Sequence, residues 1–358
     1  MATVTVTETM TLTGEEHKQQ RATRTTIRDI ARLAGVSVAT VSRVVNERPD
    51  VAPETRKVVL RVMRAQGFTT NRNARALSGG RTGLIGVTVP FLEEMYFTAI
   101  LAGASEALYE QDQRLVLCPT HHEHAREVTL LETMMSGTTD GAIVLLPEES
   151  SRELHALEAH GFPFVVCDPR QPLDDGIPAV SATHAAGSRA ATDHLIGLGH
   201  RRIGLITGTA GWLATEERVQ GYRLALAAAG LPFAPELLAG GDFTTGTGYT
   251  AGKQLLTLAT PPTAIVASND QLAVGAMRAA LERGLRIPTD ISIVGFDDTE
   301  LARSIFPRLT TVRQPLAELG RTSVSLLNRL IDGQRTEALR IELATRLVVR
   351  ESTGPAPV

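Results

Sequence analysis

The sequence predicts two structural parts: an α-helical headpiece containing a helix-turn-helix, followed by an α/β body made of two doubly wound parallel-sheet lobes. Three observations predict this arrangement. Residues 21–82 carry thirteen Lys or Arg residues against four acidic ones, a net charge of +9, whereas the whole chain carries −3. The same region has the apolar spacing of three short helices. From residue 83 onward, runs of Val, Ile and Leu alternate with helical stretches, as in parallel sheets buried on both faces.

Length and composition limit the class of protein. A chain of 358 residues is too long for one ordinary core, and 43% hydrophobic with 21% charged residues is typical of globular domains. No apolar run approaches the roughly 18–20 residues that span a bilayer. Residues 1–23 lack the features of a secretory signal and are expected to be a disordered tail. Cys118 and Cys167 are expected to be free buried thiols, which favours a cytoplasmic location.

The headpiece is predicted to contain three helices. Thr26 and Asp29 form a capping pattern at the start of the first, and Gly35 ends it. A three-residue turn leads to the second helix at 38–46, and the third begins at Pro53 behind Ala52, a poor capping residue. The residues expected to face inward are Ile27, Ile30, Leu33 and Ala34, then Val41, Val44 and Val45, then Val58, Val59, Val62 and Met63.

In a helix-turn-helix, the second helix enters the DNA major groove with its N-terminus first. Arg43 is then placed for a bidentate contact to guanine, and Val38 and Ala39 for apolar contact to a thymine methyl group. The hydroxyls expected at phosphates are those of Thr26, Ser37, Thr40 and Ser42. A basic headpiece attached to a body with a net charge of −10 is typical of nucleic-acid binding. Charge alone leaves open the alternative that the basic residues form a solvent-exposed face that binds no partner.

The body is predicted to hold two similar series of strands, one starting near residue 84 and one near 203. The apolar runs are 83–90, 114–119, 140–147, 162–168, 201–208, 263–270 and 291–298. Ligands of such sheets bind at the carboxyl ends of the strands, so we expect a cleft between two lobes.

Polar and aromatic residues near these strand ends are the candidate ligand contacts. Carboxylates accept from paired hydroxyls, Arg and Asn donate, and an aromatic ring covers the apolar face of a sugar. The candidates are Asp168, Arg218, Phe243, Asn269, Asp297, Gln314, Tyr96 and Phe97. An Asp at a strand end often caps the next helix instead, and we expect Asp270 and Asp298 to have such structural roles.

The string TIRDIARLAGVSVATVSRVVNERPDVAPETRKVV resembles the headpiece of the LacI/GalR (lactose-repressor) family. The next segment, GFTTNRNARALSGGRTGLIGV, is similar to the family's hinge, and the resemblance runs through most of residues 25–352. It implies a periplasmic-binding-protein-like body whose chain crosses three times between the lobes. It also implies that six candidates, Asp168, Arg218, Asn269, Asp297, Phe243 and Gln314, fall on effector-contact positions.

By this resemblance, the hinge at about Asn73 to Ser78 becomes helical when two protomers sit on DNA. Leu77 then acts as an apolar wedge in the minor groove, which unstacks a base step and bends the duplex; an ordinary linker role for Leu77 is the alternative. The residues expected at the minor groove are Asn71, Arg72, Ala74, Arg75 and Leu77.

The resemblance predicts the domain boundaries. They are a tail at 1–23, a headpiece at 24–70, a hinge at 71–82, a core at 83–352 and a tail at 353–358. Within the core, the N-lobe is expected at about 83–182 and 315–342, and the C-lobe at about 183–312 and 343–352.

The predicted function is a homodimeric repressor of carbohydrate-use genes that binds a palindromic operator and a small sugar-like effector, with no cofactor, no metal and no membrane partner. A dimer is favoured because the last residues hold no leucine heptad. A solute-binding receptor and a nucleobase-responsive regulator are the alternatives. A glycosidase using Asp168 and Asp297 is a third reading, but the headpiece favours binding over turnover, so no enzyme is expected.

Three features complicate the prediction. PFLEEMYF replaces the usual run after the first strand, SATHAAG lacks the Asp-Asn pair often found before its glycine, and Arg170 adds a cation near the cleft. The effector of a relative therefore cannot be transferred. His121, His122 and His124 suggest a metal, but with no second ligand cluster a solvated run is favoured.

Overall fold

The computed structural model describes residues 25–45, 48, 50–66, 68, 81–334 and 338–357. The chain divides between Thr82 and Gly83 into two compact units, which are considered separately. The expected tail at 1–23 and the hinge residues Asn71, Arg72, Ala74, Arg75 and Leu77 lie outside the described residues. In the described ranges, no helix has the length and apolar character needed to cross a bilayer.

The headpiece contains the three predicted helices, α1 (Ile27–Ala34), α2 (Val38–Val45) and α3 (Pro53–Ala65). The capping box of α1 is confirmed: the Asp29 amide donates to the Thr26 hydroxyl, and the Thr26 amide donates to the Asp29 carboxylate. Gly35 ends the helix at φ 68°, a left-handed conformation that glycine adopts without strain. Ala52 makes no side-chain cap at α3, as expected.

Two residues predicted to face the headpiece core do not. Leu33 is 50% exposed and Val58 is 39% exposed, whereas Ala31, beside Ile30, is buried. The buried residues of this core are Ile30, Ala31, Val41, Val44, Val51 and Val59. A helix of eight residues has only two turns, so its buried stripe is narrow and the neighbouring helices decide which apolar positions it includes.

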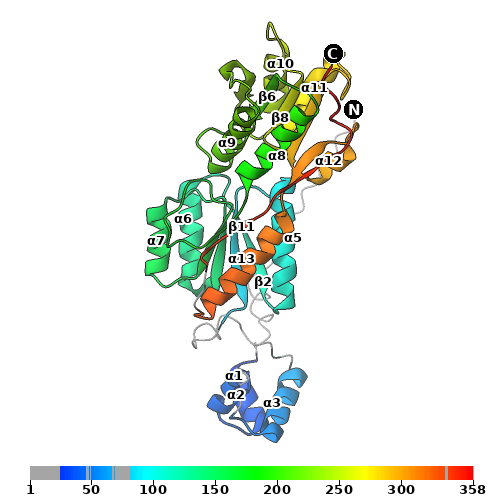
Figure 1. The fold of residues 1–358 in the computed structure, drawn as a ribbon. Coiled ribbons are helices and arrows are strands. Elements are labelled where there is room, and N and C mark those ends of the chain that lie inside the picture. Colours follow the sequence, from blue (N-terminus) through cyan, green and yellow to red (C-terminus); the bar gives the residue numbers. More distant parts are fainter. Residues whose placement is uncertain are drawn as a thin grey trace, which may run out of the picture. The chain divides into compact units, whose positions relative to one another are not determined.

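The N-lobe is a parallel six-stranded sheet in the order β11-β5-β4-β3-β1-β2. Its strands are β1 (Leu84–Val89), β2 (Arg114–Pro119), β3 (Gly141–Leu145), β4 (Phe164–Cys167), β5 (Ala179–Ala182) and β11 (Arg340–Leu343). Helices α5 (Met95–Glu110) and α13 (Leu316–Ile331) cover one face, and α6 (His124–Thr133) and α7 (Ser151–Ala159) cover the other (Figure 1). A short π-helix, Met134–Thr138, follows α6.

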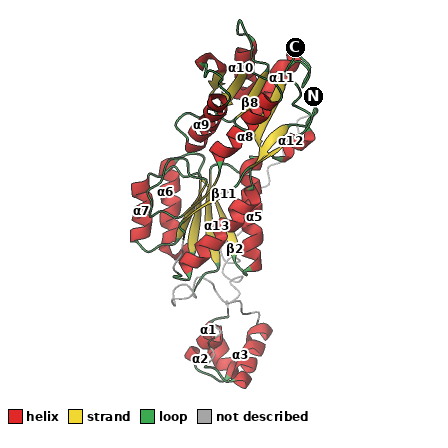
Figure 2. Ribbon diagram, in the orientation of Figure 1, coloured by secondary structure: helices red, strands yellow, loops and turns green. Residues whose placement is uncertain are grey.

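The C-lobe repeats this three-layer architecture with the order β12-β10-β9-β8-β6-β7. Its strands are β6 (Ile203–Thr207), β7 (Leu238–Gly240), β8 (Ala264–Ala267), β9 (Ser292–Asp297), β10 (Thr310–Arg313) and β12 (Arg346–Val348). Helices α8 (His184–Gly197) and α9 (Leu213–Ala228) cover one face, and α10 (Thr245–Leu256) and α11 (Asp270–Glu282) cover the other (Figure 2). Two short helices, η3 (Pro235–Leu237) and α12 (Glu300–Ser304), complete the lobe.

The two predicted lobes and all seven predicted strands are present, but the C-lobe sheet is not wholly parallel. Strand β12 pairs antiparallel with β10 at the sheet edge. This arises because β11 and β12 are joined by only two residues, Ala344 and Thr345, so the chain leaves one sheet and enters the other without a helix that would reverse its direction.

The chain crosses between the lobes three times, as the resemblance implies: from β5 to α8, from β10 to α13 and from β11 to β12. The first and third crossings are hydrogen-bonded to each other. The Thr345 amide donates to the Thr183 hydroxyl at 3.0 Å, and the Thr345 hydroxyl donates to the Thr183 carbonyl at 3.0 Å. Beyond the third crossing, residues 352–356 lie against the C-lobe, where the Ala356 amide donates to the Leu198 carbonyl.

The exposure difference between Ile30 and Leu33 gives a prediction for the headpiece. Ile30→Ala should lower its free energy of unfolding by about 2–5 kcal/mol, because it removes a wholly buried side chain and leaves a cavity. Leu33→Ala, the matched control on the same helix, should change it by less than about 0.5 kcal/mol. Hydrogen exchange of the α1–α3 amides measures both values, and equal losses would contradict the assignment.

Candidate functional site

A cavity of about 350 Å³ lies between the two lobes at the carboxyl ends of their strands. We call this cavity the cleft. Both lobes contribute to its wall, as expected for doubly wound sheets whose switch points face each other. Of the eight candidate contacts, seven line it: Tyr96, Phe97, Asp168, Arg218, Phe243, Asn269 and Asp297. Gln314 does not line the cleft but hydrogen-bonds to Asp297, which does.

A chain of polar side chains crosses the floor of the cleft from one lobe to the other. The Tyr96 hydroxyl donates to Asp168 Oδ2 at 2.6 Å. His184 Nε2 lies 3.1 Å from Asp168 Oδ1, and Arg218 Nη2 lies 3.2 Å from His184 Nδ1. Arg218 also donates through Nη1 to the Ser268 carbonyl. Asp168 comes from the N-lobe and Arg218 from the C-lobe, so this chain joins the lobes.

Arg218 is a buried cation with unused donors. Its side chain is 5% exposed, and its Nε has no hydrogen-bond partner in the described structure. The guanidinium lies over the Phe296 ring, with Cζ 4.1 Å from the ring centroid, which stabilises the charge by a cation–π interaction. Arg218 also lines the cleft, where a guanidinium is suited to bind a ligand oxygen.

The two carboxylates that flank Arg218 have opposite pKa shifts. Burial raises the pKa of Asp168, but hydrogen bonds from His184 and Tyr96 and the charge of Arg218 outweigh it, so this pKa lies below its ordinary value. Burial raises the pKa of Asp297 well above its ordinary value, only partly offset by Arg218, whose Nη2 lies 4.0 Å from Asp297 Oδ1. The cleft therefore offers one ionised acceptor and one carboxyl that holds its proton more tightly.

Aromatic rings form the C-lobe wall of the cleft. The ring centroids of Trp212 and Phe243 lie 5.6 Å apart, and a side chain on Gly208 would collide with the Phe243 ring. Trp212 also lies 5.7 Å from the ring of His122, an N-lobe residue. Flat apolar rings beside hydrogen-bonding groups match the two kinds of surface on a pyranose or furanose ring.

Two candidates have structural duties of their own. Asn269 caps α11 by accepting from the Leu272 amide at 2.8 Å, and its Nδ2 donates to the Phe243 carbonyl at 3.0 Å. Phe97 lines the cleft but is 3% exposed and belongs to the N-lobe core. Asn269 therefore holds the Phe243 loop in place, and a contact from either residue to a ligand stays a prediction.

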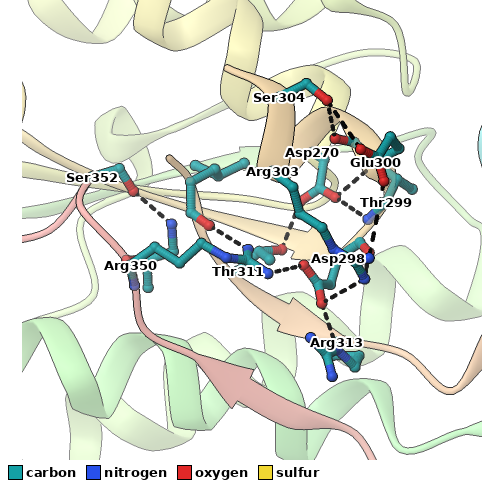
Figure 3. Close-up of polar contacts among 12 residues, drawn as sticks. Asp270, Asp298, Thr299, Glu300, Arg303, Ser304, Thr311, Arg313, Arg350 and Ser352 are labelled. Atoms are coloured by element: carbon teal, nitrogen blue, oxygen red, sulfur yellow. Dashed lines mark hydrogen bonds and ion pairs between the residues drawn. The ribbon is translucent and has the colours of Figure 1, made fainter. Parts of the chain in front are cut away.

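The contacts of Asp298 agree with the expected structural role, whereas Asp270 combines such contacts with a place on the cleft wall (Figure 3). Asp270 accepts from the Thr311 hydroxyl at 2.6 Å and from the Thr299 amide at 2.8 Å, which connects α11 to the loop before α12. The Asp298 side chain is wholly buried and pairs with three guanidinium groups, those of Arg303, Arg313 and Arg350. Asp298 thereby ties the last segment of the chain to β10 and α12.

Two histidines of the run expected to be solvated contact carboxylates. His122 Nδ1 lies 2.8 Å from Glu148 Oε1, and His124 Nε2 lies 2.9 Å from Glu153 Oε1. Within the described ranges, no three His, Cys, Asp or Glu side chains gather as a metal site. Arg170, the extra cation, pairs with Glu148 and lies over the Trp212 ring, with Cζ 5.6 Å from its centroid.

Of the residues predicted to contact the major groove or the phosphates, Thr26 caps α1 and the others lie just before or within α2. Val38 is 43% exposed, and Ala39 is exposed. Arg43 is exposed, with only a weak partner, since its Nε lies 3.7 Å from Asp50 Oδ2. Ser37 caps α2 by accepting from the Thr40 amide at 3.0 Å, and the Thr26 hydroxyl is engaged in the α1 cap. Arg43 is thus available to a partner, while both capping hydroxyls already have intramolecular bonds.

His184 and Trp212 are the two aromatic residues of greatest importance to the site that the sequence does not single out as candidates. His184 is the histidine of SATHAAG, the segment that departs from the usual pattern before its glycine. Trp212, the single tryptophan of the chain, follows the β6 strand in GTAGW. A lone aromatic residue at a strand end was the available signal for Trp212, but its contact with the other lobe depends on the tertiary fold.

Comparisons with known proteins agree with this geometry. Residues 26–71 match the sequence signature of bacterial regulatory proteins, lacI family, and residues 192–353 match a periplasmic binding protein-like domain. Catabolite control protein A of Priestia megaterium is 32% identical over 329 residues, which cover 92% of this chain and 99% of that protein.

Two solved structures are also similar. The lac repressor dimer bound to operator and the anti-inducer ONPF matches with a TM-score of 0.81 and 32% identity, over 92% of this chain and 99% of that one. The complex of the transcriptional regulator CelR with cellobiose matches with a TM-score of 0.71 and 34% identity, over 92% of this chain and 100% of that one.

The Asp298 cluster gives a prediction that separates it from the cleft. Asp298→Ala should lower the free energy of unfolding of the body by about 3–5 kcal/mol, because removing a buried carboxylate leaves partly buried guanidinium groups unpaired. Asp193→Ala, which breaks the exposed pair with Arg189, should cost less than about 1 kcal/mol. Urea unfolding measures both, and a comparable loss in the two variants would refute the structural role of Asp298.

Proposed function

The chain belongs to the lacI family of bacterial regulatory proteins, which are DNA-binding regulators and not enzymes, and we propose that it is a cytoplasmic repressor of carbohydrate-use genes controlled by a sugar-like effector. It binds a palindromic operator as a homodimer, with one headpiece in each of two major grooves. When bound, it is associated with the nucleoid. The observation that carries the effector proposal is the cleft, where Arg218, Asp168 and Asp297 lie beside Trp212 and Phe243.

A sugar fits this cleft better than a nucleobase does. A sugar offers several hydroxyls that both donate and accept, and the carboxyl groups of Asp168 and Asp297 and the guanidinium of Arg218 supply complementary partners. The solved CelR structure holds cellobiose and is 34% identical to this chain. A nucleobase-responsive regulator is the second candidate, because Trp212 and Phe243 also offer ring faces for stacking.

Within the headpiece, we propose that Arg43, Val38 and Ala39 read base edges while Thr26, Ser37, Thr40 and Ser42 contact phosphates. The hinge residues Asn71, Arg72, Ala74, Arg75 and Leu77 contact the minor groove, with Leu77 as the wedge. A solute-binding receptor, which shares the bilobed body, has no use for this basic surface. Attachment to duplex DNA that weakens steeply with added salt distinguishes the regulator from the receptor.

Arg43 gives the test of sequence reading. Arg43→Ala should abolish the preference for guanine at one position of each half-site, with a loss of about 1–3 kcal/mol of discrimination. Arg61→Ala, which removes an exposed arginine on α3 that is not among the proposed base contacts, should leave the base preference unchanged. Selection from a randomised duplex pool measures both, and an unchanged base preference in Arg43→Ala would count against the assignment.

The effector is tested with a panel of pentoses, hexoses and short oligosaccharides, with adenine and guanine as the nucleobase arm. At least one sugar should raise the melting temperature of the native chain, since binding to the folded state stabilises it. Arg218→Ala should abolish that shift and the response of operator binding to the same sugar, while operator affinity without sugar is retained. A shift by a nucleobase alone would replace the sugar proposal, and a normal sugar response in Arg218→Ala would refute the cleft assignment.

A further inference from the structure

His184 occupies a position where the cleft and the crossings between the lobes meet. It is the first residue of α8 and directly follows Thr183. Thr183 lies in the first crossing and hydrogen-bonds to Thr345, which lies in the third crossing. Its side chain is 3% exposed and lies between Asp168 of the N-lobe and Arg218 of the C-lobe. No other residue in the described part of the chain hydrogen-bonds through its side chain to both of these cleft residues.

The hydrogen bonds determine which nitrogen of His184 carries the proton. A guanidinium only donates, so His184 Nδ1 must accept from Arg218 Nη2. The proton of the neutral ring is then on Nε2, which donates to Asp168 Oδ1. The imidazole thus bridges an N-lobe acceptor and a C-lobe donor.

The backbone beside His184 is tied directly to the third crossing. The Thr183 amide donates to the Leu343 carbonyl at 3.0 Å, and the Thr183 hydroxyl accepts from the Thr345 amide at 3.0 Å. One turn further along α8, Gly187 is so close to Thr345 and Phe296 that a Cβ atom would collide with both. A movement of the His184 ring therefore cannot be absorbed by loose packing around the start of α8.

We propose that His184 is a positioning residue that couples the occupancy of the cleft to the first and third crossings. A ligand that donates to Asp168 or accepts from Arg218 competes with the imidazole for the same two groups. The ring then loses one of its hydrogen bonds. As a result, the start of α8 is held less firmly and the hydrogen bonds between Thr183 and Thr345 weaken. This inference rests on the proposed function for the identity of the ligand but not for the coupling itself.

The coupling is tested without ligand or DNA, by weakening the His184 bond from the Asp168 side. Asp168→Asn suits this purpose because Asp168 has φ 54°, a left-handed conformation that Asn tolerates, and because it removes the charge that strengthens the bond. The readout is hydrogen exchange of the Thr183 and Thr345 amides, measured by mass spectrometry on the full-length chain. In the native background, Asp168→Asn should speed this exchange about fivefold, as expected when a charge-assisted bond becomes a neutral one.

The same substitution is then made in a His184→Leu background, which completes a double-mutant cycle. There, Asp168→Asn should change the exchange less than about 1.5-fold, because the connecting ring is absent. His184→Gln, whose amide can both donate and accept, should restore part of the response. Arg218→Met approaches the ring from the C-lobe side and should reproduce the fivefold effect if Asp168→Asn folds poorly.

Two matched controls separate coupling from general loss of stability. Tyr96→Phe removes the other partner of Asp168 without touching His184, and His200→Gln changes a second buried histidine, whose partners are Thr263, Ser292 and Gly354. Both should leave exchange at Thr183 and Thr345 unchanged. The proposal is overturned if Asp168→Asn and Arg218→Met leave the exchange of the Thr183 and Thr345 amides unaltered. It is also overturned if their effect is the same with and without His184, or if His200→Gln gives the same increase in exchange. Since the experiment contains no sugar and no operator, these outcomes are independent of the proposed function.

Discussion

The buried guanidinium of Arg218 is the constraint on which the rest of the body depends. A cation 5% exposed is tolerated only when charge and hydrogen bonds surround it, because its desolvation costs several kcal/mol. Here the surroundings come from four different places: the Ser268 carbonyl, His184, Asp297 and the face of Phe296. All four belong to the C-lobe, and His184, the first residue of α8, continues the chain of bonds to Asp168 of the N-lobe. Satisfying this one side chain therefore fixes the C-lobe edge of the cleft, and His184 links that edge to the N-lobe.

The four buried aspartates near the strand ends divide into two pairs with different duties. Asp270 and Asp298 have donors or cations on both sides and connect secondary-structure elements within the C-lobe. Asp168 and Asp297 line the cleft, as Asp270 also does, but their contacts lead toward Arg218. Asp297 and Asp298 are neighbours in sequence, and both adopt positive φ angles, so the turn after β9 sends one carboxylate to the cleft and the next to the arginine cluster.

Much of the fold follows from local sequence signals. The capping box at Thr26 and Asp29, the glycine that ends α1 and the seven apolar runs all correspond to observed elements, because each depends on neighbouring residues or on a strand buried on both faces. The errors have the opposite origin. Leu33 and Val58 carry the right spacing but are exposed, since neighbouring helices decide which side of a short helix is covered. Asn269 lines the cleft as expected, but only the tertiary structure shows that its amide group also caps α11 and holds the Phe243 loop.

The sequence by itself determined the class of protein: the basic helix-turn-helix, the two α/β lobes and the residue types around a cleft can all be read from spacing and composition. Only the tertiary structure decided how these side chains share their bonds. Whether a carboxylate faces a ligand or an internal arginine, and whether a histidine joins two lobes, depends on contacts between residues far apart in the chain. Local propensity carries no information about such contacts, because they form only when strands from separate segments end at the same edge.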